Sequence, residues 1–208
     1  MQGSTRNPLV LTGNPGYFEA TDYVTLLEKP DNLDRAAGDV HGDGNPHIQL
    51  DPRRILRVAE ALSKRLQAID SDNKAYYQIK YEAFQNQLEQ SIKNWNERSS
   101  TLKNKRVIVH HREWVYMLDW LGMIGVGSLE PKPGIPPSLE HLAALKKIEA
   151  DIIIISPLNS NKPSKWLNEK TNTPVVTLPH TINAVPNTDN FIDFFNVIVE
   201  RLLENVDK

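Results

Sequence analysis

The sequence predicts an α/β protein whose second half contains a parallel sheet covered by helices. After Lys105, short apolar runs alternate with segments of helical periodicity. The runs RVIVHH (106–111), DIIIIS (151–156) and PVVTL (174–178) are almost continuously apolar rather than alternating. Such runs are typical of strands that are buried on both faces, and the strand–helix alternation is typical of parallel sheets.

Two helices are predicted ahead of this sheet. The first 50 residues are rich in turn formers, and only 17–29 could form a short helix there. Asp51 is a good N-cap and Pro52 suits the first helical position, so a helix begins here and ends near residue 70. A longer helix follows from 70–73 over about 25 residues. Its apolar stripe is interpreted as core-facing rather than as a cofactor box, because helical spacing alone accounts for Tyr77, Tyr81, Phe84, Leu88, Ile92 and Trp95.

The remaining elements follow in a regular order. A helix is expected directly after the strand at 106–111, and a short strand near 126–131. A further helix begins at Ser138, another covers about 161–170, and a last helix begins near Asp189. The inner face of that last helix is formed by Phe191, Phe194, Phe195, Ile198 and Leu202.

Composition excludes several classes of function. Against 24 Lys and Arg stand 26 Asp and Glu, so there is no basic surface of the kind that binds nucleic acid. The absence of cysteine excludes disulfides, thiolate metal sites and cysteine nucleophiles. The common nucleotide-binding and hydrolase motifs are absent as well. A metal-dependent hydrolase would need a general base such as Glu113 or Glu130, and no motif fixes either residue.

Histidine is the residue type that indicates a site. His110 and His111 end the strand at 106–111, and alternation along the strand lets only one of them face the crevice in the same way. His180 follows another strand, and His47 precedes a helix. Carboxyl ends of parallel strands meet at one edge, where ligands bind. Each histidine could equally be an ordinary loop residue, as we expect for His41, and His141 is expected to be solvated within its helix. Glu130 is either a partner of such a site or a turn residue.

Four segments, taken in order, resemble one family. GDVHGDGNPHIQLDP, VIVHHREWVYMLDWLGM, LEPKPGIPPS and TPVVTLPHT are similar to the periplasmic metal-binding receptors of zinc and manganese ABC transporters. The resemblance implies a two-lobed metal-receptor fold with a long connecting helix. It assigns 1–72 to a partial N-terminal lobe, 73–99 to the connecting helix and 100–208 to the C-terminal α/β lobe.

The resemblance also implies a site and partners. The family's ligand in NPHxxLDP matches His47, and its ligand in HxxxxY matches His111, with Tyr116 as the tyrosine. His180 stands where some members have a carboxylate. The ligand set His47, His111 and His180 favours Zn²⁺ over Mn²⁺, because neutral imidazoles suit zinc whereas manganese prefers carboxylates.

The family further implies delivery to a membrane permease, an extracytoplasmic location and no enzymatic activity. The family begins with strands and a ligand histidine that have no counterpart here, so we expect an incomplete N-terminal lobe. The alternative is a degenerate or truncated receptor that acts as an interaction protein and forms homo-oligomers.

Overall fold

The computed structural model describes residues 7–29 and 42–206. Its core is a four-stranded sheet made of β1 (Arg106–Val109), β2 (Ile124–Ser128), β3 (Ile152–Ile155) and β4 (Val175–Thr177). The strand order is β2-β1-β3-β4 and every neighbouring pair is parallel. The predicted parallel α/β sheet is therefore confirmed. The short second strand lies two residues earlier than expected, because the Ile124 amide donates to Lys105 O and starts the pairing there.

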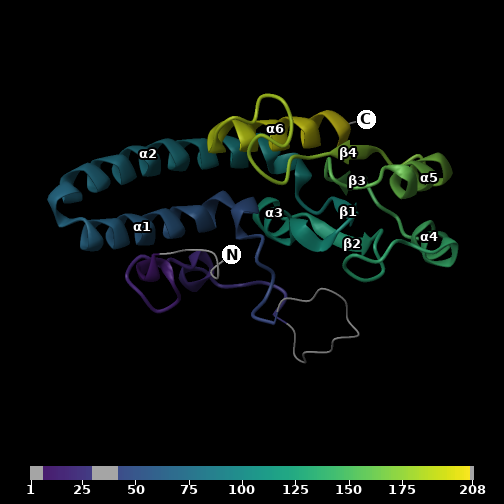
Figure 1. Cartoon of the computed structure of the whole chain (residues 1–208). Helices are drawn as coiled ribbons and strands as arrows, with labels where there is room; N and C mark the ends of the chain where they lie inside the picture. The colour runs from purple at the N-terminus through teal and green to yellow at the C-terminus, as the bar shows by residue number, and fades with distance from the viewer. Residues whose placement is uncertain (1–6, 30–41, 207–208) are drawn as a thin grey trace.

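Helices cover both faces of the sheet, as Figure 1 shows. Side chains of Val107 and Ile154 pack on one face together with α3 (Val115–Leu121) and α6 (Phe191–Val206). Ile108 and Ile153 point to the other face, which α4 (Leu139–Leu145) and α5 (Lys162–Thr171) cover. Since successive strand residues alternate between the faces, a short apolar strand supplies two cores at once.

The two predicted N-terminal helices form a long antiparallel pair that extends away from the sheet (Figure 1). Helix α1 spans Pro52–Ile69 and α2 spans Lys74–Arg98. The predicted stripe on α2 faces inward where it meets α6: Trp95 is buried and donates from Nε1 to Asn196 Oδ1 at 2.8 Å, and Phe84 packs on Phe191. This confirms the interpretation as a core stripe.

The described residues ahead of α1 contain short 3-10 turns, such as Ala20–Tyr23 and Ile48–Leu50, and no strand. The short helix considered for 17–29 is thus reduced to a single turn. Leu26, Leu27, Ile48 and Leu50 nevertheless pack against the main core. This packing places the segment that carries His47 beside the sheet.

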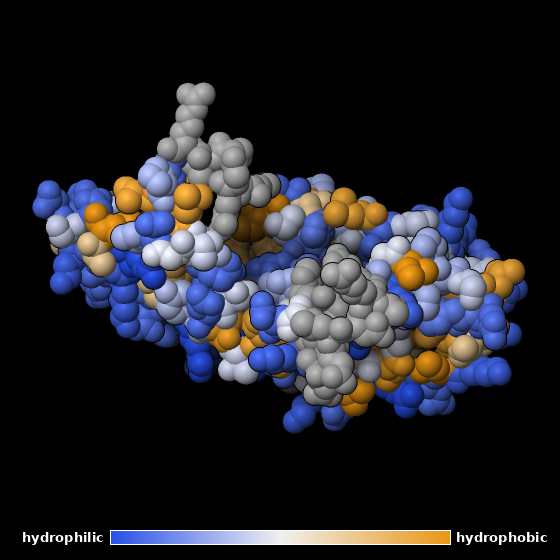
Figure 2. Space-filling model, turned by 60° about the horizontal axis from the view of Figure 1, so that its bottom comes forward, coloured by the Kyte–Doolittle hydropathy of each residue, from blue (hydrophilic) through white to orange (hydrophobic). Residues whose placement is uncertain are grey.

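The surface is mixed in character. On the face that Figure 2 shows, apolar side chains lie in several separate groups among hydrophilic ones. Helices α1 and α2 carry exposed apolar residues, among them Leu62, Ile69, Tyr76 and Ile79. None of the described helices combines the length and apolarity needed to cross a membrane.

Candidate metal site

His47 and His111 come together at the edge of the sheet although 64 positions separate them in the chain. His47 lies just before the 3-10 turn Ile48–Leu50, and His111 lies two residues after the end of β1, in extended backbone conformation. Their rings meet edge to face with centroids 6.4 Å apart. Two imidazoles on one tetrahedral Zn²⁺, each with a Zn–N distance of about 2.0–2.1 Å, have centroids roughly 5 Å apart. A modest approach of the two rings would therefore let them share one ion.

Glu130 lies behind His111 and holds its ring. Its Oε2 is 2.8 Å from His111 Nδ1 and accepts from the Gly134 amide at 2.9 Å. A histidine whose Nδ1 is bound to a carboxylate keeps Nε2 for a metal, and the carboxylate fixes the ring orientation. Glu130 thus bonds both the ring of His111 and the backbone of the turn that follows Glu130 itself.

His110 points to the other oxygen of the same carboxylate. Its Nε2 is 3.8 Å from Glu130 Oε1, and the residue is buried. Burial lowers the pKa of His110 against the opposing effect of Glu130, so the ring is neutral at physiological pH. His110 and Glu130 also line a cavity of about 620 Å³ beyond the carboxyl ends of β1 and β3. These are the strands between which the chain order reverses, a position where such sheets bind ligands.

His180 is the third predicted ligand. It follows β4, is half-buried, and its Nδ1 is buried with no hydrogen-bond partner. Within 7–29 and 42–206, no group of three or more histidines and carboxylates is arranged to hold a metal ion. The described structure therefore does not bring His47, His111 and His180 together as a ready-made site.

Two other histidines complete the set. His41 falls outside the described residues. His141 was expected to be solvated, which is wrong: its Nε2 lies 2.8 Å from Ser128 O, at the end of β2. The helical periodicity around His141 could not reveal this contact, because it depends on how α4 packs against the sheet.

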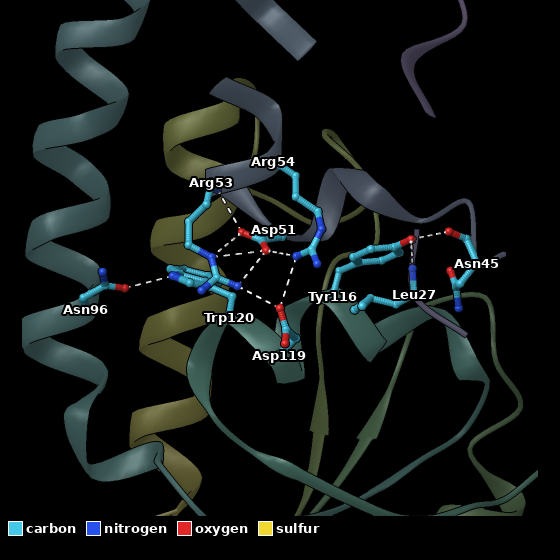
Figure 3. Close-up of polar contacts among 9 residues, drawn as sticks. All are labelled: Leu27, Asn45, Asp51, Arg53, Arg54, Asn96, Tyr116, Asp119 and Trp120. Carbon is cyan, nitrogen blue, oxygen red and sulfur yellow. Dashed lines mark hydrogen bonds and ion pairs between the residues drawn. The ribbon is translucent and has the colours of Figure 1, made fainter. Parts of the chain in front are cut away.

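Asn45 links the two histidine-bearing segments, and sequence reasoning missed it. Its Oδ1 accepts from the His47 amide at 3.0 Å, and its Nδ2 donates to Arg112 O at 2.8 Å and to Glu28 Oε2 at 3.0 Å. The Tyr116 hydroxyl donates to Asn45 O at 2.5 Å and accepts from the Leu27 amide at 3.0 Å (Figure 3). The only signal in the sequence is the position of Asn45 within NPH.

Asp51 anchors the start of α1 to the sheet domain. Its fully buried carboxylate accepts from the Arg53 amide at 2.9 Å, which confirms the predicted N-cap. The same carboxylate pairs with the Arg53 and Arg54 guanidinium groups, and both also reach Asp119 on α3 (Figure 3). The Arg54 guanidinium stacks over the Tyr116 ring at 4.8 Å. The helix start is thereby fixed beside the tyrosine that holds Asn45.

Glu113 is a buried carboxyl group two residues after His111. It is 7% exposed and its Oε1 has no hydrogen-bond partner. Burial raises the pKa of Glu113 to about 7, with a smaller lowering effect from His111. Its ordinary value is 4.5. The folded metal-free protein therefore keeps this group protonated at pH values where the unfolded chain has ionised it.

This difference predicts a pH-dependent effect of Glu113→Gln on the metal-free protein. Because the folded pKa is raised, the wild type loses stability as pH rises from about 4.5 to 7, and the loss is constant above 7. At pH 8 the variant should be more stable by on the order of 2 kcal/mol, and the gain should shrink toward zero at pH 5. Urea unfolding at both pH values measures it, with the exposed Glu140→Gln as control. An equal gain at pH 5 and pH 8 would contradict the prediction.

Comparisons with known proteins agree with this fold. "Crystal structure of ZnuA" superposes with a TM-score of 0.73 at 20% identity, covering 90% of this chain and 69% of that one. The solute-binding protein FpvC of Pseudomonas aeruginosa, in complex with Mn²⁺, gives 0.74 at 17% identity, covering 96% and 73%. A Cd-bound periplasmic metal-binding protein of Candidatus Liberibacter asiaticus gives 0.66 at 16% identity, covering 85% and 74%. No curated protein matches. The chain thus spans between 69% and 74% of the length of these neighbours.

The fold is that of solved periplasmic metal-binding proteins and solute-binding proteins. The model of the family "Zinc-uptake complex component A periplasmic" (ZnuA) matches residues 9–205. The chain belongs to this family, and the resemblance drawn from its motifs is confirmed. Its members are periplasmic receptors that bind divalent metal for ABC uptake systems and are not enzymes, so the expectation of a non-enzymatic function is confirmed too.

Proposed function

We propose that this chain binds a divalent transition metal, with zinc preferred, and delivers it to the membrane permease of an ABC transporter. His47, His111 and His180 are the proposed protein ligands. The observation that carries the proposal is the edge-to-face pairing of His47 with His111, whose other ring nitrogen is held by Glu130. That arrangement places two imidazoles side by side and orients the ring of His111, as suits a zinc site.

The preference for zinc over manganese rests on ligand chemistry. Imidazole nitrogen suits the borderline Zn²⁺ ion in tetrahedral geometry, whereas Mn²⁺ favours oxygen ligands and higher coordination. Glu130, the carboxylate bonded to His111 Nδ1, is also engaged by the Gly134 amide. Neighbours of the same fold carry Mn²⁺ in one structure and Cd in another, which supports a divalent cation as cargo in general.

As part of the same proposal, the chain divides into two lobes and a connecting helix. Residues 1–72 belong to the N-terminal lobe, α2 acts as the connecting helix and 100–208 form the second lobe. Helix α2 spans Lys74–Arg98, close to the range expected for a connector. Membership in a periplasmic family supports an extracytoplasmic location. Protein and permease would meet there, with no role for nucleic acid.

Calorimetric titration of the intact chain with ZnCl₂ and MnCl₂ tests this function. At pH 7.5 we expect one zinc ion per chain and weaker binding of manganese. Since ligation requires neutral imidazole, zinc affinity should fall as the pH is lowered through about 6.5. A chain that takes up no zinc at pH 7.5 would overturn the proposal.

One observation favours the alternative of a degenerate receptor that acts as an interaction protein. The described residues contain no ready-made group of three or more metal-binding side chains. In that case the exposed apolar residues of α1 and α2, such as Tyr76 and Ile79, would take part in oligomer contacts. Size-exclusion chromatography with light scattering separates the two functions. A zinc-binding monomer supports the receptor, and a metal-free oligomer supports the alternative.

A further inference from the structure

Asn45 uses all of its hydrogen-bonding groups between two segments distant in sequence. Its backbone amide donates to Leu27 O at 2.8 Å, and its backbone oxygen accepts from the Tyr116 hydroxyl. Its side-chain oxygen accepts from the His47 amide, and its side-chain nitrogen donates to Arg112 O and Glu28 Oε2. An asparagine side chain offers two donor hydrogens and one oxygen, so this residue is fully satisfied in the buried position that it occupies.

These bonds connect the backbone on either side of the histidine pair. The His47 amide is bonded directly to Asn45, and Arg112 is the residue that follows His111. One side chain therefore bridges the backbone of one histidine to the backbone beside the other. Glu28 supports the bridge from a third segment, because its Oε1 also pairs with Arg112 at 3.2 Å.

Tyr116 fixes the bridge to the sheet domain. The tyrosine is fully buried in α3, five residues after His111, and its hydroxyl bonds both Asn45 O and the Leu27 amide. The Arg54 guanidinium on its ring ties it to α1, the helix that follows His47. These contacts fix the positions of helix α1, helix α3 and the loop of Asn45 relative to one another (Figure 3).

From this geometry we infer that Asn45, supported by Tyr116, is a positioning residue that sets the separation of His47 and His111 before metal arrives. The inference rests on the proposed function, since it concerns the same two ligands. A site already held near its bound geometry loses less free energy to ordering when the ion binds. Residues outside the ligand shell that orient ligands in this way typically change metal affinity 10–100-fold when they are removed.

The test compares Asn45→Ala with a matched control, Asn168→Ala. Asn168 also donates from Nδ2 to a backbone oxygen, Thr173 O at 2.8 Å, but it joins α5 to the loop before β4. Zinc affinity is measured by competition with a chromophoric chelator, and urea unfolding is measured without metal. We expect Asn45→Ala to weaken zinc binding 10–100-fold and Asn168→Ala to leave it unchanged within about threefold. Tyr116→Phe, which removes one hydroxyl only, should weaken binding in the same direction.

A metal-free readout accompanies the affinities. With ring centroids 6.4 Å apart, the imidazole protons of His47 and His111 are close enough for nuclear Overhauser cross-peaks. We expect these peaks in the wild type and in Asn168→Ala, and their loss in Asn45→Ala. Unchanged affinity and unchanged cross-peaks in folded Asn45→Ala would overturn the inference while leaving the proposed function intact. Failure of the wild type to bind zinc would instead overturn the proposed function, and the cross-peaks would then decide the positioning role alone.

Discussion

Replacing His111 by alanine is expected to lower zinc affinity by about 100-fold or more. The variant removes an imidazole whose Nδ1 is held by Glu130 at 2.8 Å and whose ring faces His47. Loss of an oriented ligand costs more than loss of a residue that only orients one. His47→Ala should have an effect of the same size, because the two rings contribute equally to the pair. Chelator competition at pH 7.5 measures both.

His141→Ala is the matched control for these variants. It also removes one histidine, whose Nε2 is bonded to Ser128 O rather than directed at the pair. Its zinc affinity should equal that of the wild type. If His111→Ala and His141→Ala bound zinc equally well, the pairing of His47 with His111 would not be the site.

Replacing Asp51 by alanine is expected to destabilise the protein by about 3 kcal/mol. The carboxylate is fully buried, caps α1 at the Arg53 amide and pairs with two arginines. Breaking a buried ion pair typically costs about 3–5 kcal/mol. The lower end applies here, because the Arg53 side chain is 44% exposed and stays partly hydrated. Urea unfolding of the metal-free protein measures the change.

The variant Asp119→Ala tests whether burial of the carboxylate explains the large loss of stability expected for Asp51→Ala. Asp119 pairs with the same arginines, at 2.9 Å from Arg53 and 3.2 Å from Arg54, but its side chain is 48% exposed. Exposed ion pairs contribute little, so this variant should lose less than about 1 kcal/mol. An Asp51→Ala variant no less stable than Asp119→Ala would show that the buried carboxylate is not what anchors α1.

The contacts around Asp51 and those around Asn45 depend on each other. The ion pairs of Asp51 fix the start of α1, and Arg54 then rests on the ring of Tyr116. Tyr116 in turn bonds Asn45, which holds the segment of His47 against the turn after His111. The proposed metal site is therefore supported by a chain of contacts that begins at a helix cap.

Local chemistry explains which parts of this arrangement can be predicted from sequence. Asp51 and Pro52 define a helix start through their own backbone preferences. The run RVIV defines a buried strand, so His111 must lie at its end. The His47–His111 pairing followed from the resemblance to a family and from the rule that ligands bind at the carboxyl edge of the sheet.

Contacts between distant segments could not be predicted in the same way. Asn45 looks like an ordinary loop residue until its bond to Arg112 O, 67 positions away, is seen. Glu130 reads equally well as a turn residue, because its bond to His111 depends on β2 pairing beside β1. The prediction that His141 is solvated was wrong for a related reason. Helical periodicity carries no information on which backbone oxygen a polar side chain will reach.

X-ray absorption spectroscopy of the zinc-loaded chain tests the central claim most directly, because it reports the atoms bound to the metal. We predict a first shell of nitrogen and oxygen at about 2.0–2.1 Å, with outer-shell scattering from at least two imidazole rings. The imidazole signal should fall in His111→Ala. A shell of oxygen atoms alone, with no imidazole scattering, would contradict the assignment of His47 and His111 as ligands.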